Sequence, residues 1–161
     1  MSNNSVVFSA LESIAEILEI APPSTNAENC WSLTITDYHS VYFSEARKGD
    51  HLYLYSPLME GVPQDSDLLL GIYETALEKN MNYSNTQIGN ISWDSDLELL
   101  LYYKRLVLKD LDEAFLVLFL PVFIEASFEW RKTLNDFTTG KTMKKKKSPE
   151  KGTEPPHHLK L

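Results

Sequence analysis

Two histidines with an acidic neighbour are the residues of this sequence best suited to acid–base chemistry. Asp37 stands two positions before His39, and Asp50 directly precedes His51. A carboxylate beside an imidazole can make a general base. Both pairs lie in polar turn segments, where such pairs are common by composition alone. We therefore expect neither pair to be catalytic, and a small hydrolase using His39 or His51 is the enzyme alternative.

The sequence lacks the spaced motifs that phosphate, metal and acyl-transfer chemistry require. It contains no glycine-rich phosphate loop, HExxH, CxxC or GxSxG. Asp94, Asp96 and Glu98 have the alternate spacing of a calcium loop, but the glycine and the distal glutamate of that loop are missing. The adjacent His157 and His158 have no carboxylate or thiol beside them to complete a metal site. No catalytic residue, metal site or cofactor is expected.

Cysteine usage and hydropathy indicate a cytoplasmic protein. Cys30 is the single cysteine and cannot form an internal disulfide, which suits a reducing compartment. Residues 1–7 lack the charged and apolar segments of a signal peptide. The longest apolar run, residues 115–124, is interrupted by Pro121 and is far shorter than the ~20 residues that span a bilayer. No membrane insertion is expected.

Charge is distributed unevenly along the chain. Residues 141–161 hold seven of the 15 basic residues and two of the 23 acidic ones, so they carry +5 against −13 on residues 1–140. An acidic body repels nucleic acid phosphates, and no nucleic acid partner is expected. The lysine run 144–147, followed by Ser148 and Pro149, is typical of a disordered segment. We expect one folded domain over residues 1–140 and a disordered lysine-rich tail over residues 141–161.

The first helix is expected over residues 9–20. Ser9 and Glu12 have the spacing of a capping box, and Pro22 ends the pattern. Apolar residues follow the i, i+3, i+4, i+7 rows of one helical face: Leu11, Ile14, Ala15 and Leu18. Three more lie off that face: Phe8, Ile17 and Ile20. This helix therefore has more apolar surface than one core contact uses.

Two later segments are also expected to be helical. Ser66 or Asp65 can cap a helix running to about residue 80, whose apolar residues occupy more than one stripe and would be partly exposed in a monomer. Asp110 is suited to cap a longer helix running to about residue 137. Pro121 should kink or divide that helix, because it removes a backbone donor and crowds the preceding turn.

Alternating apolar and polar residues between turn signals predict five strands. Pro57 opens a predicted loop after the third of them, and the last strand is apolar on both faces, as in a strand covered on both sides. The predicted strands are residues 30–36, 41–46, 52–56, 87–93 and 97–106. The order is helix, three strands, helix, two strands, helix. The sequence thus predicts an α+β fold with helices packed on an antiparallel sheet.

A strand pair followed by a long helix with a Trp-Arg pair gives the C-terminal half a distinctive pattern. Its residues are Ile91, Trp93, Asp94, Leu99, Leu101, Leu108, Leu111, Phe115, Phe123, Ala126, Trp130, Arg131 and Leu134. This pattern resembles the Tir/CesT family, the class I chaperones of type III secretion. The resemblance covers about residues 5–137 and implies that residues 1–140 form a chaperone domain.

Two segments resemble most closely the chlamydial multiple-cargo branch of that family. They are LYLYSPLMEGVP at residues 52–63 and the helix containing Ile72, Tyr73 and Glu74. The chain departs from the family where many members have a glycine in the last hairpin, since Ser95 and Asp96 stand there. The turn geometry at that point is therefore not carried over.

The resemblance implies a cytoplasmic, non-catalytic homodimer that binds N-terminal segments of secreted effectors in a largely extended form. It places Leu70, Tyr73 and Leu77 near the two-fold axis. Main-chain pairing at a sheet edge and apolar pockets for alternate side chains would hold the client. The secretion ATPase is a further expected partner, and no cofactor or nucleotide is expected.

The first helix and first strand are expected to supply the client-binding groove. The expected residues are Phe8, Leu11, Ile17, Trp31, Leu33 and Ile35, with Val41 and Phe43 second. The alternative for each of these residues is a place in the core. For the whole molecule, the alternative is an adaptor or regulator whose dimer binds a folded partner, such as a component of transcription or of the secretion base.

Overall fold

The structure, a computed structural model, describes residues 3–27, 29–46, 50–61, 63–81 and 88–139. The predicted tail over residues 141–161 and the predicted start of the fourth strand lie outside these ranges. The elements in chain order are α1 (Asn3–Ile17), β1 (Ser24–Ala27), β2 (Cys30–Thr36), β3 (His39–Glu45), β4 (His51–Glu60), α2 (Ser66–Met81), β5 (Asn90–Asp94), β6 (Leu99–Val107), the 3-10 helix η1 (Leu108–Asp110) and α4 (Glu113–Thr138).

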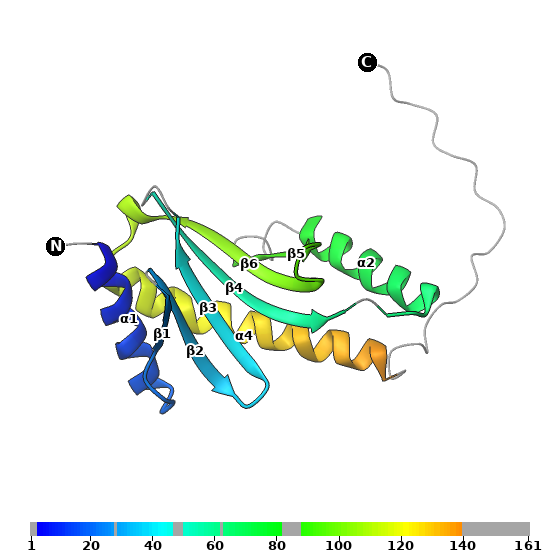
Figure 1. Ribbon diagram of the computed structural model, residues 1–161, viewed down its shortest axis with the longest axis horizontal. Helices are drawn as coiled ribbons and strands as arrows, with labels where there is room; N and C mark the ends of the chain where they lie inside the picture. The colour runs from blue at the N-terminus through cyan, green and yellow to red at the C-terminus, as the bar shows by residue number, and fades with distance from the viewer. Residues whose placement is uncertain (1–2, 28, 47–49, 62, 82–87, 140–161) are drawn as a thin grey trace, which may run out of the picture.

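The strands form a six-stranded antiparallel sheet in the order β1-β2-β3-β4-β6-β5. Helices α1 and α4 pack on each other and against one face of the sheet (Figure 1). Helix α2 lies beside β5 and packs on α4. The predicted α+β fold and the predicted order of elements are confirmed, and the polar strand β1, which has no apolar alternation, is added at the edge.

The core lies between the helix-covered face of the sheet and helices α1 and α4. Its largest fully buried apolar side chains are Leu11, Ile14, Leu33, Phe43, Leu52, Leu54, Ile72, Leu116, Leu120, Phe123 and Leu134. Strands β3 and β4 bury every second residue over most of their length, as strands with one covered face do.

Helix α1 begins at Asn3, well before the predicted start, so the proposed capping box lies inside the helix. It also ends earlier than predicted. Glu19 has a φ of 54°, and the amide of Ile20 donates to the carbonyl of Ala15. This left-handed residue with a 6→1 hydrogen bond is the Schellman form of helix ending. The chain therefore leaves the helix by its own turn before it reaches Pro22.

Strand β4 continues through Pro57 to Glu60, so the prediction of a loop from Pro57 is wrong. The register to β6 shifts between Pro57 and Met59, and such a β-bulge is one of the places where a strand accommodates proline. Arg131 of α4 donates from Nη1 to the carbonyl oxygen of Pro57 at 3.0 Å. The irregular strand is thus tied to the helix that covers it.

Helix α4 begins after Asp112, whose Oδ1 accepts from the amide of Phe115 at 2.7 Å. Asp110 is not the cap because residues 108–110 form the 3-10 turn η1. Pro121 does not divide the helix. Aromatic rings stack along the turns around it, Phe115 on Phe119 and Phe119 near Phe123. These contacts hold the turns together across the missing hydrogen bond.

Asp65 caps α2, because its Oδ1 accepts from the amides of Asp67 and Leu68. Strand β6 has only one face covered by helices, so the expectation of cover on both sides is not met within one chain. None of the described helices combines the length and the apolar character needed to cross a bilayer.

Candidate binding surfaces

His39 is fully buried under α4 and does not pair with Asp37. Its Nε2 lies 3.0 Å from Ser127 Oγ, and that hydroxyl already donates to the carbonyl of Ile124. His39 must therefore donate from Nε2, and its buried Nδ1 has no hydrogen-bond partner in the described structure. Burial, with a contribution from the charge of Arg131, lowers the pKa of His39 to about 4. A neutral, enclosed imidazole of this kind is a core residue.

The second predicted acid–base pair does form. His51 Nδ1 lies 3.0 Å from Asp50 Oδ1, in a part-exposed position where β4 begins. This pair lines neither the hollow over the open face of the sheet nor the pocket beside Arg131. In the predicted hairpin, Asp94 Oδ1 accepts from the amides of Asp96 and Leu97, so this carboxylate shapes the turn. Within the described ranges, no three His, Cys, Asp or Glu side chains are arranged to hold a metal ion.

Five of the eight predicted client-binding residues lie inside the core. Their exposed fractions range from 0% to 5%: Leu11, Trp31, Leu33, Val41 and Phe43. Such side chains are not accessible on the surface of this chain, and a client could reach them only if the core opened. Alternation in a strand shows which side chains share a face, but not whether that face is covered by a helix or left open. The core alternative therefore applies to these five positions.

Three predicted client-binding residues keep apolar surface. Ile17 is 62% exposed at the end of α1, while Phe8 and Ile35 are partly buried and pack against the rim of the core. Ser13 Oγ donates to Glu113 Oε1 at 3.4 Å, so the middle of α1 lies beside the start of α4.

Helix α4 adds an apolar surface that the sequence analysis did not assign. Phe115, Leu118 and Val122 are spaced by three and four residues, which places them on one helical face, and all three are exposed, Leu118 by 75%. The signal in the sequence was the apolar run over residues 115–124. That run covers more of the helix than a single core contact requires.

The residues predicted for the two-fold axis form one exposed stripe on α2. Leu70, Tyr73 and Leu77 are 53%, 37% and 66% exposed, and Met81 extends the stripe by another turn. The opposite face of α2 is buried at Ile72 and Ala76. Helix α2 therefore has two apolar faces, and this chain covers one of them.

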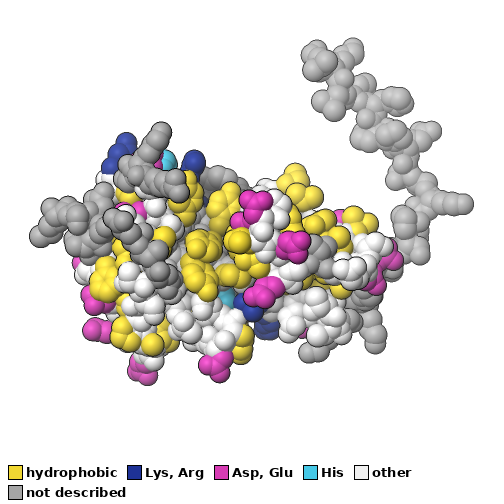
Figure 2. Space-filling view, in the orientation of Figure 1, with side chains coloured by type: hydrophobic (Ala, Val, Ile, Leu, Met, Phe, Trp, Pro, Cys, Tyr) yellow, Lys and Arg dark blue, Asp and Glu magenta, His cyan; other side chains and the backbone are white. Residues whose placement is uncertain are grey.

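The uncovered face of the sheet is also apolar and aromatic, and Figure 2 shows hydrophobic side chains over both the sheet and α2. Tyr42, Tyr55 and Tyr103 are successive neighbours across β3, β4 and β6, and the rings of Tyr42 and Tyr55 stack at 5.3 Å. Beside them a hollow of about 610 Å³ is lined by residues that include Trp93 and Leu101.

The two edges of the sheet differ. At the β5 edge, the side chain of Asn80 bonds to both backbone groups of Ile91. Its Nδ2 donates to the Ile91 carbonyl at 2.9 Å, and its Oδ1 accepts from the Ile91 amide at 3.0 Å. At Ile91 the side-chain amide thus makes the two hydrogen bonds that a neighbouring strand would make. Strand β1, at the other edge, pairs with β2 alone.

The sheet, the two helices on one face and the exposed apolar stripes agree with a known family of proteins. The family model of the Tir chaperone protein (CesT) family matches residues 9–131. The chain belongs to the Tir chaperone protein (CesT) family. The matched residues include all six strands, α2 and most of α1 and α4. No curated protein matches the chain.

Three solved structures share the fold of this Tir chaperone family member. A chain of the ExsC–ExsE complex has a TM-score of 0.61 at 16% identity, over 83% of this chain and 97% of its own. A chain of the HopA1–SchA chaperone–effector complex has a TM-score of 0.59 at 14% identity, over 83% and 95%. A chain of the ExoT–SpcS complex from Pseudomonas aeruginosa has a TM-score of 0.52 at 22% identity, over 78% and 97%. At these identities the likeness establishes the fold.

Proposed function

We propose that this Tir chaperone family member is a non-catalytic type III secretion chaperone. It binds the N-terminal segment of secreted effectors and keeps that segment stable and export-competent. The observation that carries this proposal is the apolar surface left exposed on a Tir chaperone fold, on α1, α2, α4 and one face of the sheet. Solved structures with this fold include a complex described as chaperone and effector.

The client surface in this proposal is the apolar part of α1 and α4 together with the free edge of β1. Ile17, Leu118 and Val122 offer exposed apolar area, and Phe8 and Ile35 line the rim of the core. An extended client can pair its backbone with β1, because an edge strand presents unpaired N–H and C=O groups. Helix side chains then bind alternate residues of the client.

The homodimer in this proposal forms through α2 and the uncovered face of the sheet. The stripe of Leu70, Tyr73 and Leu77 would be costly for a monomer to leave in water, and a two-fold axis places the same stripe of a second copy against it. The hollow beside Trp93 and the tyrosine row continues the apolar surface over the sheet. Two copies would thereby cover surface that neither covers alone.

The proposal also covers the compartment, a further partner and the branch of the family. The protein acts in the cytoplasm, the compartment that its single cysteine suits. The secretion ATPase receives the loaded chaperone. The segment at residues 52–63 and Ile72, Tyr73 and Glu74 support a place in the chlamydial multiple-cargo branch.

Co-expression with candidate effectors, followed by limited proteolysis and mass determination, tests the proposed function. We expect a protected effector fragment of about 50 to 100 residues from the N-terminal part, the length that a disordered segment needs to wrap a large surface. Ile17→Gln and Leu118→Gln should each shorten or remove the fragment, because each removes exposed apolar area from the client surface. Leu77→Gln, at a similarly exposed leucine on the dimer surface, is the matched control and should leave the same fragment.

Two results would contradict the proposal. One is an effector segment digested equally fast with and without the chaperone. The other is recovery of a stable folded partner with no protected N-terminal fragment, which would instead support the adaptor function.

A further inference from the structure

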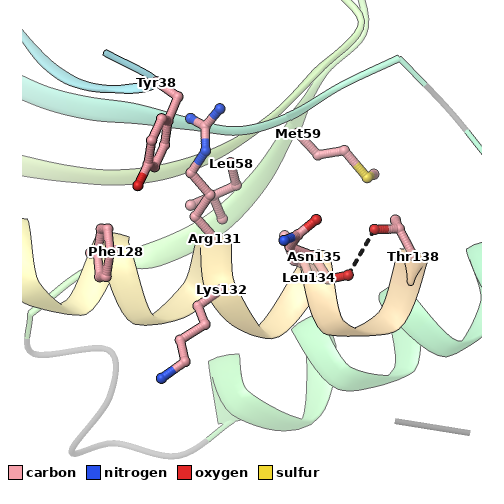
Figure 3. Close-up of a pocket in the computed structure, with 9 residues that line it drawn as sticks. All are labelled: Tyr38, Leu58, Met59, Phe128, Arg131, Lys132, Leu134, Asn135 and Thr138. Carbon is pink, nitrogen blue, oxygen red and sulfur yellow. Dashed lines mark hydrogen bonds between the residues drawn. The ribbon is translucent and has the colours of Figure 1, made fainter. Parts of the chain in front are cut away.

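A pocket outside the client and dimer surfaces lies between the second half of α4, the end of β4 and the turn between β2 and β3 (Figure 3). Its volume is about 460 Å³. Tyr38 from the turn and Phe128 from α4 stand at one end, and Leu58 and Met59 of β4 form the strand side. The bulge in β4 shapes this wall, because the register shift between Pro57 and Met59 adds Leu58 to the strand there.

The pocket contains a guanidinium whose position is fixed by a hydrogen bond. Arg131 points from α4 toward β4, beside Tyr38 and Leu58 in Figure 3, and its bond to the carbonyl of Pro57 fixes the guanidinium there. A guanidinium has five N–H donors, so most of them remain for another acceptor. No carboxylate of the described residues lies within ion-pair distance of Arg131. Lys132 also lines the pocket, but its side chain points away from Arg131 in Figure 3, so Arg131 is the cation that faces β4.

The neighbouring histidine does not add a positive charge to that of Arg131. His39 packs edge-on against the ring of Phe128 at 5.7 Å, and burial keeps its pKa at about 4. His39 is therefore neutral near pH 7 and adds no charge beside Arg131. Arg131 therefore carries its positive charge in a body whose net charge is −13 over residues 1–140.

The charge and shape of the pocket indicate its occupant. A guanidinium held beside aromatic and aliphatic walls favours a carboxylate that is followed closely by an apolar side chain. Residues 141–161 carry +5 and would be repelled by the positive charge of Arg131. We propose that this pocket is a second client site, which binds an acidic-apolar peptide segment through Arg131. This inference rests on the proposed chaperone function and names one class of segment that the chaperone selects.

Binding of two short acetylated and amidated peptides to the full-length protein tests the inference. In one peptide Glu alternates with Leu and Phe, and in the other Gln replaces each Glu. Fluorescence anisotropy should show about tenfold tighter binding of the Glu peptide, the effect of one charge-assisted hydrogen bond in a part-exposed site. Arg131→Met should remove that difference. Lys109→Gln, an exposed lysine outside the pocket, should preserve it.

Arg131 also anchors β4, so a second variant separates binding from folding. Tyr38 is 64% exposed at the turn, and Tyr38→Ser should leave the thermal unfolding midpoint unchanged while weakening both peptides by about threefold to tenfold, since it removes an aromatic wall. A peptide with the sequence of residues 140–161 should not compete with the Glu peptide. Competition would overturn the inference in favour of the chain's own tail as the occupant.

Two outcomes separate failure of this inference from failure of the proposed function. Equal affinity for the Glu and Gln peptides, with an effector fragment still protected from proteolysis, overturns the acidic-apolar site alone. Absence of any protected fragment removes the chaperone function on which the site rests. Loss of the Glu preference in Arg131→Met, together with a preserved preference in Lys109→Gln and a protected effector fragment, supports both.

Discussion

His39 shows at the scale of one residue how burial decides whether a histidine can do chemistry. In the sequence it stands near Asp37 in a polar turn, the arrangement of a general base. In the structure its ring turns toward α4, donates to Ser127 and packs against Phe128. The sequence could not show this contact, because Ser127 lies 88 positions away along the chain. The same contact makes His39 sensitive to acid in a way that can be measured.

We expect His39 to make the folded state less stable as the pH falls. Its pKa is about 4 in the folded protein and about 6.5 in the unfolded chain, so the unfolded chain binds more protons between these values. Stability should therefore decrease below about pH 6.5, by about 2 kcal/mol between pH 7 and pH 5. Urea unfolding of the wild type and of His39→Gln at both pH values measures this contribution. If the two proteins lose equal stability, His39 is not the titrating group.

At the scale of elements, the sequence predicted the boundaries that are set by residues close together in the chain. The bounds of β2 were predicted from the alternation of Trp31, Leu33 and Ile35, and the start of α2 from Asp65 or Ser66. The continuation of β4 through Pro57 could not be predicted, because it depends on a bulge and on Arg131 from a distant helix. The burial of Leu33 and Phe43 could not be predicted either, since a helix rather than a partner covers that face.

The Asn80 contact with β5 leads to a prediction at this scale. Asn80→Ala removes both hydrogen bonds to Ile91 and leaves the outer backbone groups of that residue unpaired. We expect a loss of about 1 to 2 kcal/mol in the free energy of unfolding, at about 1 kcal/mol for each bond. Hydrogen exchange at the Ile91 amide should become faster. Asn135→Ala, on the exposed side of α4, is the control and should leave that amide protected. Unchanged exchange in Asn80→Ala would show that the edge is shielded by something else.

At the scale of the whole molecule, the two apolar surfaces should have separate roles. Leu77 lies on the α2 stripe and Leu118 on α4, and the two leucines are 66% and 75% exposed. The sequence predicted the α2 stripe, since its apolar residues exceed one helical face. It could not show that the uncovered face of the sheet continues the same surface, because that depends on which face α1 and α4 cover.

Charge placed on each surface tests this separation. Leu77→Glu should weaken the homodimer by about thirtyfold or more, because burying an unpaired carboxylate in an apolar interface costs at least about 2 kcal/mol. Leu118→Glu should leave the dimer intact and reduce client protection. Light scattering during gel filtration measures the mass of both variants across a range of concentrations. A wild-type protein that is monomeric at every concentration would contradict the dimer, and a monomeric Leu118→Glu would contradict the separation of roles.

The single Asn80 side chain also limits the stoichiometry of complexes. A sheet with both edges open could accept a strand at each end, and carriers and cargo could then link into chains of indefinite length. Among the described strands, β5 has the outer backbone groups of Ile91 bonded to Asn80 whereas β1 pairs with β2 alone, so we expect a client strand to pair at the β1 edge of each subunit. Loaded particles should therefore remain discrete and of fixed size even when cargo is abundant.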